Sequence, residues 1–332
     1  MNQPLLTHAT QTMAVGSKSF ASASKLFDAK TRRSALMLYA WCRHCDDVID
    51  GQELGFSRDG AEYSPLSAFS NPLSDSPDAG AGYVTADSSP EQRLERLKVL
   101  THQALSGAPV SEPAFAAFQE VALASAIPER LAFDHLEGYA MDVRGEAYYT
   151  LDDTLRYCYH VAGVVGLMMA QVMGVRDPAV LDRACDLGLA FQLTNIARDI
   201  VEDAHGGRCY LPTRWLAEEG MDRANYASPV NRAALARVSR RLVDAAEPYY
   251  QSARAGLTGL PLRSAWAIAT ARGVYREIGV KVSNAGEQAW DRRQGTSKGE
   301  KLGLLLSGAG LALTSRLAKP GPRPDSLWQR PR

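Results

Sequence analysis

A polar stripe in this sequence, copied once further along the chain, constrains the fold more than any other feature. The first copy runs through YAWCRHCDDVID, among apolar neighbours. Its polar residues stand at offsets 0, 4, 7 and 11: Tyr39, Arg43, Asp46 and Asp50. Because an α-helix has about 3.6 residues per turn, these offsets share one helix face. The pattern therefore predicts a helix with two carboxylates one turn apart.

The second copy of the stripe lies in QLTNIARDIVED. Its polar residues stand at offsets 0, 3, 7 and 11: Gln192, Asn195, Asp199 and Asp203. A single acidic pair on a helix is commonly a solvated face. Two pairs with matched polar residues upstream favour two facing walls of one cavity.

Carboxylates in such an arrangement need cations. On a helix, two of them one turn apart repel each other by about a few tenths of a kcal/mol, and burial raises the cost. Mg²⁺ prefers oxygen ligands and commonly binds one or two carboxylates together with substrate phosphates. We therefore expect the aspartate pairs to hold divalent metal ions against phosphate groups. Asn195 offers a neutral oxygen ligand, and Arg43 and Arg198 offer donors to phosphate oxygens.

The rest of the sequence also favours helices. Good helix formers such as Leu, Ala and Arg are frequent, and alternating β-branched runs are scarce. Thr150 and Asp153 form a capping-box pattern. We predict an all-α chain with helices at about 17–27, 32–52, 90–106, 112–125, 128–145, 151–174, 177–203, 230–256, 261–289 and 298–315.

Two segments differ from this background. Residues 51–90 are rich in Ser, Pro, Gly and Asp, and we interpret them as a long loop inserted into one domain, 1–315, rather than as a linker between two domains. Residues 316–332 carry five Lys/Arg, one Asp and four Pro. They predict a flexible basic tail, with docking on an anionic membrane surface as the alternative.

Composition excludes several classes of protein. Lys plus Arg and Asp plus Glu are 37 each, so the net charge of zero predicts no nucleic-acid partner. Five cysteines do not form the framework of a secreted disulfide protein, and Cys42-x-x-Cys45 lacks a second pair for a zinc site. We find no signal peptide and no apolar stretch of membrane-spanning length. We expect a cytoplasmic protein without a spanning helix.

Several motifs together resemble the squalene/phytoene synthase family. They are Asp46-x-x-x-Asp50, Asn195-x-x-x-Asp199-x-x-x-Asp203, QLTNIARD, SKSFASASKLF, YCYHVAGVVG and RCYLP. The resemblance runs from about residue 17 to 313 and is strongest to the bacterial phytoene synthases. It implies a single-domain, all-α isoprenoid synthase bundle around a central cavity.

The resemblance also implies a reaction. Two geranylgeranyl diphosphates would condense head to head, giving prephytoene diphosphate and then phytoene in carotenoid biosynthesis, with release of two diphosphates. The cofactor would be Mg²⁺ or Mn²⁺, without NADPH. Squalene or dehydrosqualene synthesis from farnesyl diphosphate is one alternative. A non-catalytic assembly factor is another, although such a protein is expected to have lost carboxylates that this chain retains.

The same resemblance assigns residues. Asp46, Asp50, Asn195, Asp199 and Asp203 would be metal ligands. The rings of Tyr39 and Tyr157 would stabilise cations, or their hydroxyls would bind phosphate. Asp142 lies off both stripes, at the surface or behind the site. Substrate-binding residues would be Ser17, Ser19, Phe20, Arg43, Gln192, Arg198, Tyr275 and Arg292, the last on its distance from Tyr275 alone.

Two further expectations concern apolar segments. Ala162, Gly163 and Gly166 would leave room for a prenyl chain or allow close helix packing, and the sequence leaves both open. Residues 302–315 and the basic tail would contact a membrane peripherally, on the inner face. The resemblance also allows contact with other carotenoid enzymes.

Overall fold

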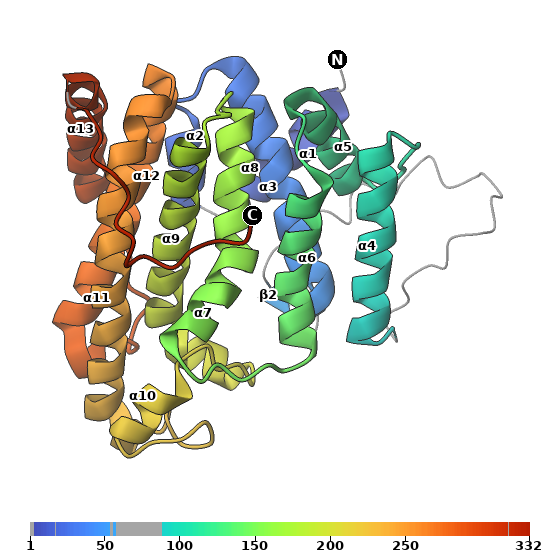
Figure 1. Cartoon of the computed structure of the whole chain (residues 1–332). Coiled ribbons are helices and arrows are strands. Elements are labelled where there is room, and N and C mark those ends of the chain that lie inside the picture. Colours follow the sequence, from blue (N-terminus) through green and yellow to red (C-terminus); the bar gives the residue numbers. More distant parts are fainter. Residues whose placement is uncertain (1–2, 17, 54–55, 58–87, 318) are drawn as a thin grey trace.

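Helices make up nearly all the regular structure of the described residues, as predicted. The computed structural model describes residues 3–16, 18–53, 56–57, 88–317 and 319–332. The helices pack side by side as a bundle (Figure 1). In order they are α1 (Gln3–Gly16), α2 (Lys18–Ser24), α3 (Ala29–Asp50), α4 (Pro90–Ser106), α5 (Pro113–Ser125), α6 (Glu129–Val143), α7 (Leu151–Cys158), α8 (Val164–Val172), α9 (Pro178–His205), α10 (Thr213–Glu218), α11 (Arg232–Gly256), α12 (Leu262–Ala285) and α13 (Lys298–Thr314).

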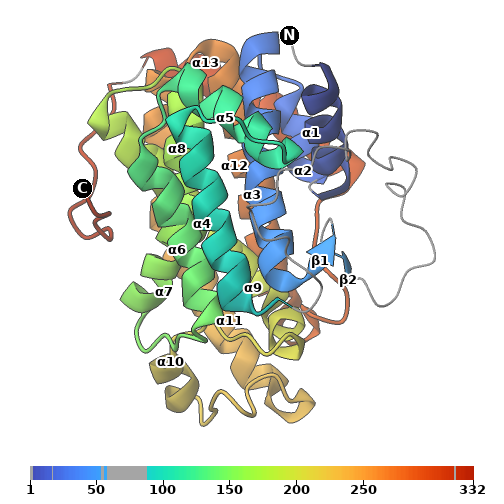
Figure 2. The same ribbon diagram turned by 90° about the vertical axis from the view of Figure 1, so that its right-hand side faces the viewer.

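The two striped helices occupy different parts of the bundle. α9 packs against α8, α11 and α12, whereas α3 packs against α1, α4 and α5 (Figure 2). Apolar residues of α9 that precede or alternate with its polar positions are buried in the core: Leu189, Ala190, Leu193, Ile196 and Ala197. The stripes are therefore carried on helices that the core holds on their other faces.

Local capping fixes the ends of α3. The Asp28 carboxylate accepts hydrogen bonds from the backbone N–H groups of Lys30 and Thr31, both at 3.0 Å. This cap starts the helix three residues before the predicted residue 32. At the other end, Gly51 adopts a φ of 64°, which glycine tolerates without strain.

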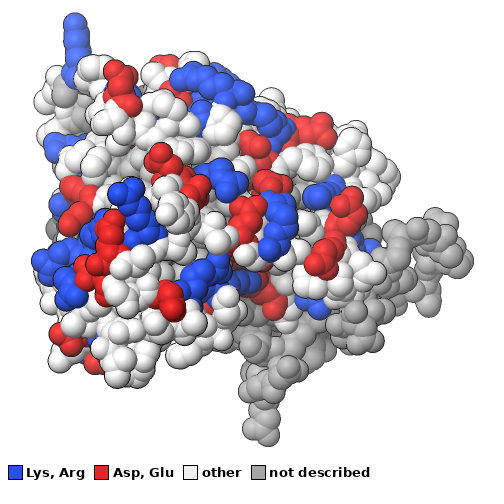
Figure 3. Space-filling model, turned by 60° about the horizontal axis from the view of Figure 1, so that its bottom comes forward, with Lys and Arg blue, Asp and Glu red and all other residues white. Residues whose placement is uncertain are grey.

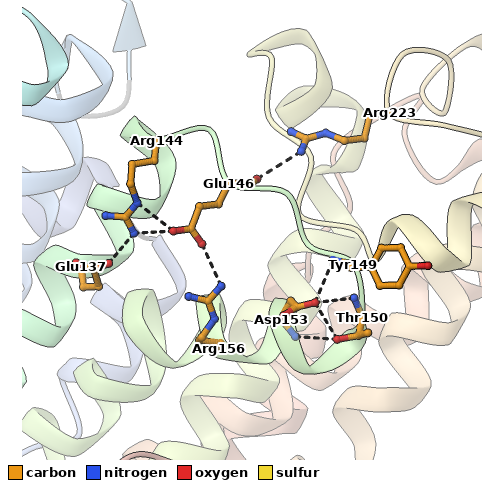
Figure 4. Close-up of polar contacts among 8 residues, drawn as sticks. All are labelled: Glu137, Arg144, Glu146, Tyr149, Thr150, Asp153, Arg156 and Arg223. Carbon is orange, nitrogen blue, oxygen red and sulfur yellow. Dashed lines mark hydrogen bonds and ion pairs between the residues drawn. The ribbon is translucent and has the colours of Figure 1, made fainter.

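The predicted capping box before α7 is confirmed. Thr150 Oγ1 accepts the N–H of Asp153 at 3.3 Å, and the Asp153 carboxylate accepts the N–H of Thr150 at 2.8 Å. Figure 4 shows this box beside an ion-pair network on the connection from α6. There Arg144 and Arg156 both bind Glu146, at 2.6 and 3.1 Å.

Three parts of the helix prediction are wrong. The predicted 151–174 helix is divided by a π-helical turn, Tyr159–Gly163. α1 was missed because its apolar face is narrow and gains its burial, at Ala9 and Met13, by packing on α3. α10 was missed because it has only six residues.

The small residues of the π turn and α8 serve close packing. A Cβ on Gly166 would lie 2.4 Å from the backbone oxygen of Ala184 on α9. A Cβ on Gly188 of α9 would lie 2.3 Å from the oxygen of Ala162. Ala162 and Gly166 also line the cavity described below. The same small residues therefore allow close helix packing and also border the space that a ligand would occupy.

The two unusual segments have different outcomes. The predicted insertion at 51–90 lies mostly outside the described residues, apart from its ends and an antiparallel pair, β1 (Gln52–Glu53) and β2 (Phe56–Ser57). Residues 319–332 of the predicted flexible tail lie instead against the bundle. Arg323, Arg330 and Arg332 pair there with aspartates of α9.

The surface agrees with the balanced composition. On the face that Figure 3 shows, acidic and basic side chains lie side by side. Within the described ranges, no helix is both long enough and apolar enough to cross a bilayer.

Candidate active site

A cavity of about 410 Å³ lies between α3 and α9. Asp46 and Asn195 line one part of it, and apolar residues of α8, α9 and α12 line the remainder. It is thus polar where the stripes meet and apolar elsewhere. The predicted residues that line it are Phe20, Tyr39, Arg43, Asp46, Tyr157, Gln192, Asn195 and Tyr275.

The α3 stripe is held by its own arginine. Arg43 pairs with Asp46 at 3.0 Å and with Asp47 at 2.6 Å. The Asp46 side chain keeps 40% of its surface open and lines the cavity. Burial among the cavity walls raises the pKa of Asp46 to about 7 against the opposing charge of Arg43, and Asp50 adds to the rise.

The α9 stripe has a similar arrangement. Asp199 pairs with its neighbour Arg198 and, at 3.1 Å, with Arg293. Burial, together with the charge of Asp199, raises the pKa of Asp203 to about 7. Both stripes therefore hold a carboxyl that is costly to ionise without an added cation.

A cation from the loop after α9 connects the two stripes. Arg208 donates to Asp50 on α3, with one contact at 3.1 Å. Burial lowers the pKa of Arg208, but its hydrogen bond to Asp50 and the nearby charges outweigh this and raise it. Its positive charge also acts on Asp46, Asp142 and Asp203. Arg208 thus belongs to the site, although no role there was predicted for it.

Asp142 is a further carboxylate of the site, so the expectation that it lies at the surface or behind the site is wrong. It lines the cavity from α6 and accepts hydrogen bonds from Tyr157 and Tyr210, each at 3.0 Å. The rings of Tyr157 and Tyr210 stack with centroids 4.5 Å apart. Burial raises the pKa of Asp142 to about 6 despite the charge of Arg208. The Tyr157 hydroxyl is therefore bound to a carboxylate in this structure.

Aromatic rings line the cavity next to the carboxylates. Phe20 stacks on Tyr39 with centroids 6.1 Å apart, and Phe191 stacks on Tyr275 at 4.2 Å. Such ring faces attract cations. Phe20 and Tyr39 both line the cavity, and their roles toward a substrate stay predictions.

For three residues that were predicted to bind phosphate, the structure does not place the side chain in the cavity. Ser17 and the side chain of Ser19 lie outside the described residues. Arg292 is exposed, and the neighbouring Arg293 is the residue that pairs with Asp199. The assignment rested on distance along the chain from Tyr275, which fixes a position only to within a residue or two. We therefore place Arg293 in the site in its stead.

The residues fit a divalent ion held jointly with a diphosphate. The side-chain oxygen of Asn195 is buried and has no hydrogen-bond partner among the described residues, whereas its amide nitrogen lies 3.4 Å from Gln192. This oxygen is available as a ligand. Within the part of the chain that the structure describes, no three His, Cys, Asp or Glu residues converge as a closed cage. Mg²⁺ commonly binds only one or two carboxylates together with substrate phosphates.

The thiol pair does not compete with this interpretation. Cys42 and Cys45 are free, and burial raises the pKa of both thiols. A raised pKa disfavours the thiolate that redox or zinc chemistry requires. Packing beside the stripe is their role.

Sequence reasoning missed Arg208, Asp142, Tyr210 and Arg293. Arg208 and Tyr210 stand in the RCYLP motif, which was a signal for them. Asp142 follows the end of an apolar helix face, and Arg293 lies in a polar loop, so neither has a local pattern.

Comparison with known proteins agrees with this geometry. The family model for squalene/phytoene synthase matches residues 13–300. The 15-cis-phytoene synthase of Pantoea ananas is 66% identical over the full length of both chains. That of Paracoccus sp. is 48% identical over 98% of each.

Solved structures show the same fold. A dehydrosqualene synthase superposes with a TM-score of 0.75 at 23% identity, over 94% of this chain and 98% of that one. A squalene synthase from Alicyclobacillus acidocaldarius gives 0.67 at 20% identity, over 86% and 97%. Fold and site together define an all-α isoprenoid synthase. The chain belongs to the squalene/phytoene synthase family.

Proposed function

We propose that this chain is a phytoene synthase that joins two geranylgeranyl diphosphates head to head. Prephytoene diphosphate would form first and would then lose its diphosphate to give phytoene. The support is the 66% identity over full length to a protein named for this activity. The site supports the same chemistry, because the carboxylates of Asp46 on α3 and Asp142 on α6 line a largely apolar cavity.

The polar part of the cavity is suited to releasing diphosphate. A bound divalent ion, Mg²⁺ or Mn²⁺, supplies positive charge for the departing group. Asp46, Asp50, Asp199 and Asp203, with Asn195, would hold it. Arg43 and Arg198 now neutralise neighbouring carboxylates. With those carboxylates holding metal ions, both guanidinium groups would be free to donate to phosphate oxygens.

The apolar part of the cavity is suited to the cation that remains. Tyr39 and Tyr275 line the cavity together with the polar residues, and each stacks on a second ring that also lines it. Apolar walls exclude the water that would otherwise capture a carbocation. No hydride donor is needed, because the cation is quenched by loss of a proton.

The test is incubation with fifteen- and twenty-carbon diphosphates and Mg²⁺, without NADPH. We expect a forty-carbon hydrocarbon from the twenty-carbon donor; a thirty-carbon product formed preferentially would favour the farnesyl diphosphate alternative. Asp46→Ala and Asp199→Ala should each abolish diphosphate release while circular dichroism stays unchanged. The matched control is Asp244→Ala, an exposed aspartate of α11. Normal turnover in either site variant would reject the metal-clamp proposal.

We also propose that α13 makes a peripheral membrane contact. Leu302, Leu306 and Leu313 expose 59, 66 and 59% of their surface, and offsets of 4 and 11 place them on one face. The basic tail was expected to join this membrane contact, but the structure places its arginines elsewhere. Its Arg323 and Arg330 pair with aspartates of α9 and are not free for lipid headgroups.

Vesicles containing anionic lipid test this contact. The double variant Leu302→Ser with Leu306→Ser should lose most vesicle binding and keep its thermal stability, because both side chains are exposed. Val230→Ser, at an 88% exposed residue outside α13, is the control. Equal sedimentation of the α13 variant and the parent with vesicles would reject the proposal.

A further inference from the structure

The C-terminal segment 319–332 is tied to a fully buried carboxylate. Arg323 donates to both oxygens of Asp186, from Nε at 2.9 Å and from Nη2 at 2.7 Å. Asp186 on α9 is 0% exposed. Bidentate pairs of this kind are strong and geometrically specific. Figure 1 shows the segment crossing the helices on its way to the C-terminus.

Further contacts hold the segment in place. Arg330 pairs with Asp182 at 2.6 Å, and the backbone N–H of Trp328 donates to the Tyr249 hydroxyl at 3.1 Å. The Trp328 ring packs against Tyr159 with centroids 5.6 Å apart. The segment is thus a strap across α9, α11 and the π turn.

The strap reaches the cavity through one residue, Arg183. Its Nη2 donates to the backbone oxygen of Gly321 in the strap at 2.7 Å. Its Nη1 donates to Ser252 at 2.9 Å, and the Ser252 hydroxyl in turn donates to Asp186. Arg183 and Arg323 therefore share one hydrogen-bonded network, and the strap supplies an acceptor and a cation to it.

Arg183 lies at the apolar end of the cavity. Arg183, Leu187, Phe191 and Asn195 all line the cavity, and they follow one another every four residues along α9. Twelve residues of helix separate Arg183 from Asn195, which is about 18 Å at 1.5 Å per residue. A prenyl chain whose diphosphate lies at Asn195 would point its other end towards Arg183.

The stem of Arg183 is confined on its other side. A Cβ on Gly256 of α11 would lie 2.6 Å from Arg183 Cβ and 3.2 Å from its Cγ. α11 therefore passes directly against the stem. Beyond the stem, the guanidinium is held by its hydrogen bonds to the strap and to Ser252.

We propose that the strap sets the longest prenyl chain the cavity accepts, by holding Arg183 as its end wall. This inference rests on the proposed condensation of prenyl diphosphates. Without Arg323, Asp186 would be a buried carboxylate without its bidentate partner, which is strongly unfavourable. Arg183, one helical turn away on α9, would turn to pair with Asp186 and leave Gly321. The end wall would then retreat, and a longer chain would fit.

The experiment is a competition among fifteen-, twenty- and twenty-five-carbon diphosphates with Mg²⁺, with the hydrocarbons quantified by mass spectrometry. For Arg323→Ala we expect kcat/KM for the twenty-five-carbon donor, relative to the twenty-carbon donor, to rise by roughly tenfold or more. Arg183→Met, in a chain with the strap intact, keeps an unbranched stem and loses the guanidinium. It should shift the ratio in the same direction.

Arg332→Ala is the matched control, because the side chain of this strap arginine is 68% exposed where it pairs with Asp182. It should leave the ratio unchanged. If Arg323→Ala and Arg183→Met lower turnover of every donor equally, the strap is merely structural and the inference is overturned. If Arg323→Ala does not fold, Arg183→Met decides alone. A parent protein that makes no hydrocarbon from any donor would instead reject the proposed function.

Discussion

Arg208 donates to Asp50 Oδ2 at 3.1 Å, and this contact joins the loop after α9 to the last turn of α3. The two carboxylate-bearing helices are thereby linked by a cation that belongs to neither. The same charge acts on Asp46 and Asp203. Arg208 is therefore placed to hold the two walls at a fixed separation before any metal ion binds.

The variant Arg208→Gln should show whether this arginine supports both catalysis and the stability of the metal-free protein. We expect kcat/KM to fall about 100-fold, since truncating one partner of a hydrogen-bonded charge pair costs about 2–5 kcal/mol. Without metal ions, the urea midpoint should fall as well. Arg223→Gln is the control, because this exposed arginine donates to the backbone oxygen of Glu146 at 3.5 Å and not to an aspartate of the stripes (Figure 4). Equal kinetics of the two variants would show that Arg208 has no special role.

Stability should depend on pH through Asp46 and Asp203. Both carboxyls have a folded-state pKa of about 7, above the ordinary value of 3.8. Between these two values the folded protein binds protons that the unfolded chain has released. Its stability therefore falls as pH rises through this window. Urea unfolding with EDTA at about pH 5 and about pH 8 measures the difference.

The double variant Asp46→Asn with Asp203→Asn should flatten this dependence. Adding Mg²⁺ at the higher pH should restore stability to the parent protein and not to the variant. A parent protein that is less stable at the lower pH would contradict the raised pKa values.

Asn195→Ala should weaken metal binding without weakening the fold. Its oxygen is buried and has no partner among the described residues, so removing it costs the metal-free protein little, within about 1 kcal/mol. The shift in melting temperature on adding Mg²⁺ and inorganic diphosphate should shrink. Gln192→Ala, which removes the neighbour of the Asn195 amide, is the comparison. An unchanged Mg²⁺ response in Asn195→Ala would exclude this oxygen as a ligand.

Gly166→Ala should destabilise the protein by about 1–3 kcal/mol, as overpacking does. A Cβ there would lie 2.4 Å from a backbone oxygen of α9, which cannot easily move. Gly303→Ala on α13 meets nothing within 4 Å and should be neutral or stabilising by up to about 1 kcal/mol. Chemical unfolding of both variants checks this contrast, and equal midpoints would contradict it.

Local patterns determined much of this protein. The spacing of Asp46 and Asp50, and of Asp199 and Asp203, sufficed to predict two helices with matching polar faces, because helical periodicity depends only on neighbours along the chain. The Thr150–Asp153 cap followed from the same locality. The boundaries of α3 and the position of the π turn were not predicted from these patterns, because capping geometry and packing against α9 adjust them.

Tertiary structure alone decided which distant groups meet. Asp142 comes from α6, Arg208 from the loop after α9 and Arg293 from the segment between α12 and α13, and no spacing along the chain brings them together. The tail shows the same limit. Its prolines and arginines predict a flexible, solvated segment, and Arg323 instead finds the fully buried Asp186. A buried carboxylate requires a partner, but only the folded chain determines which cation reaches it.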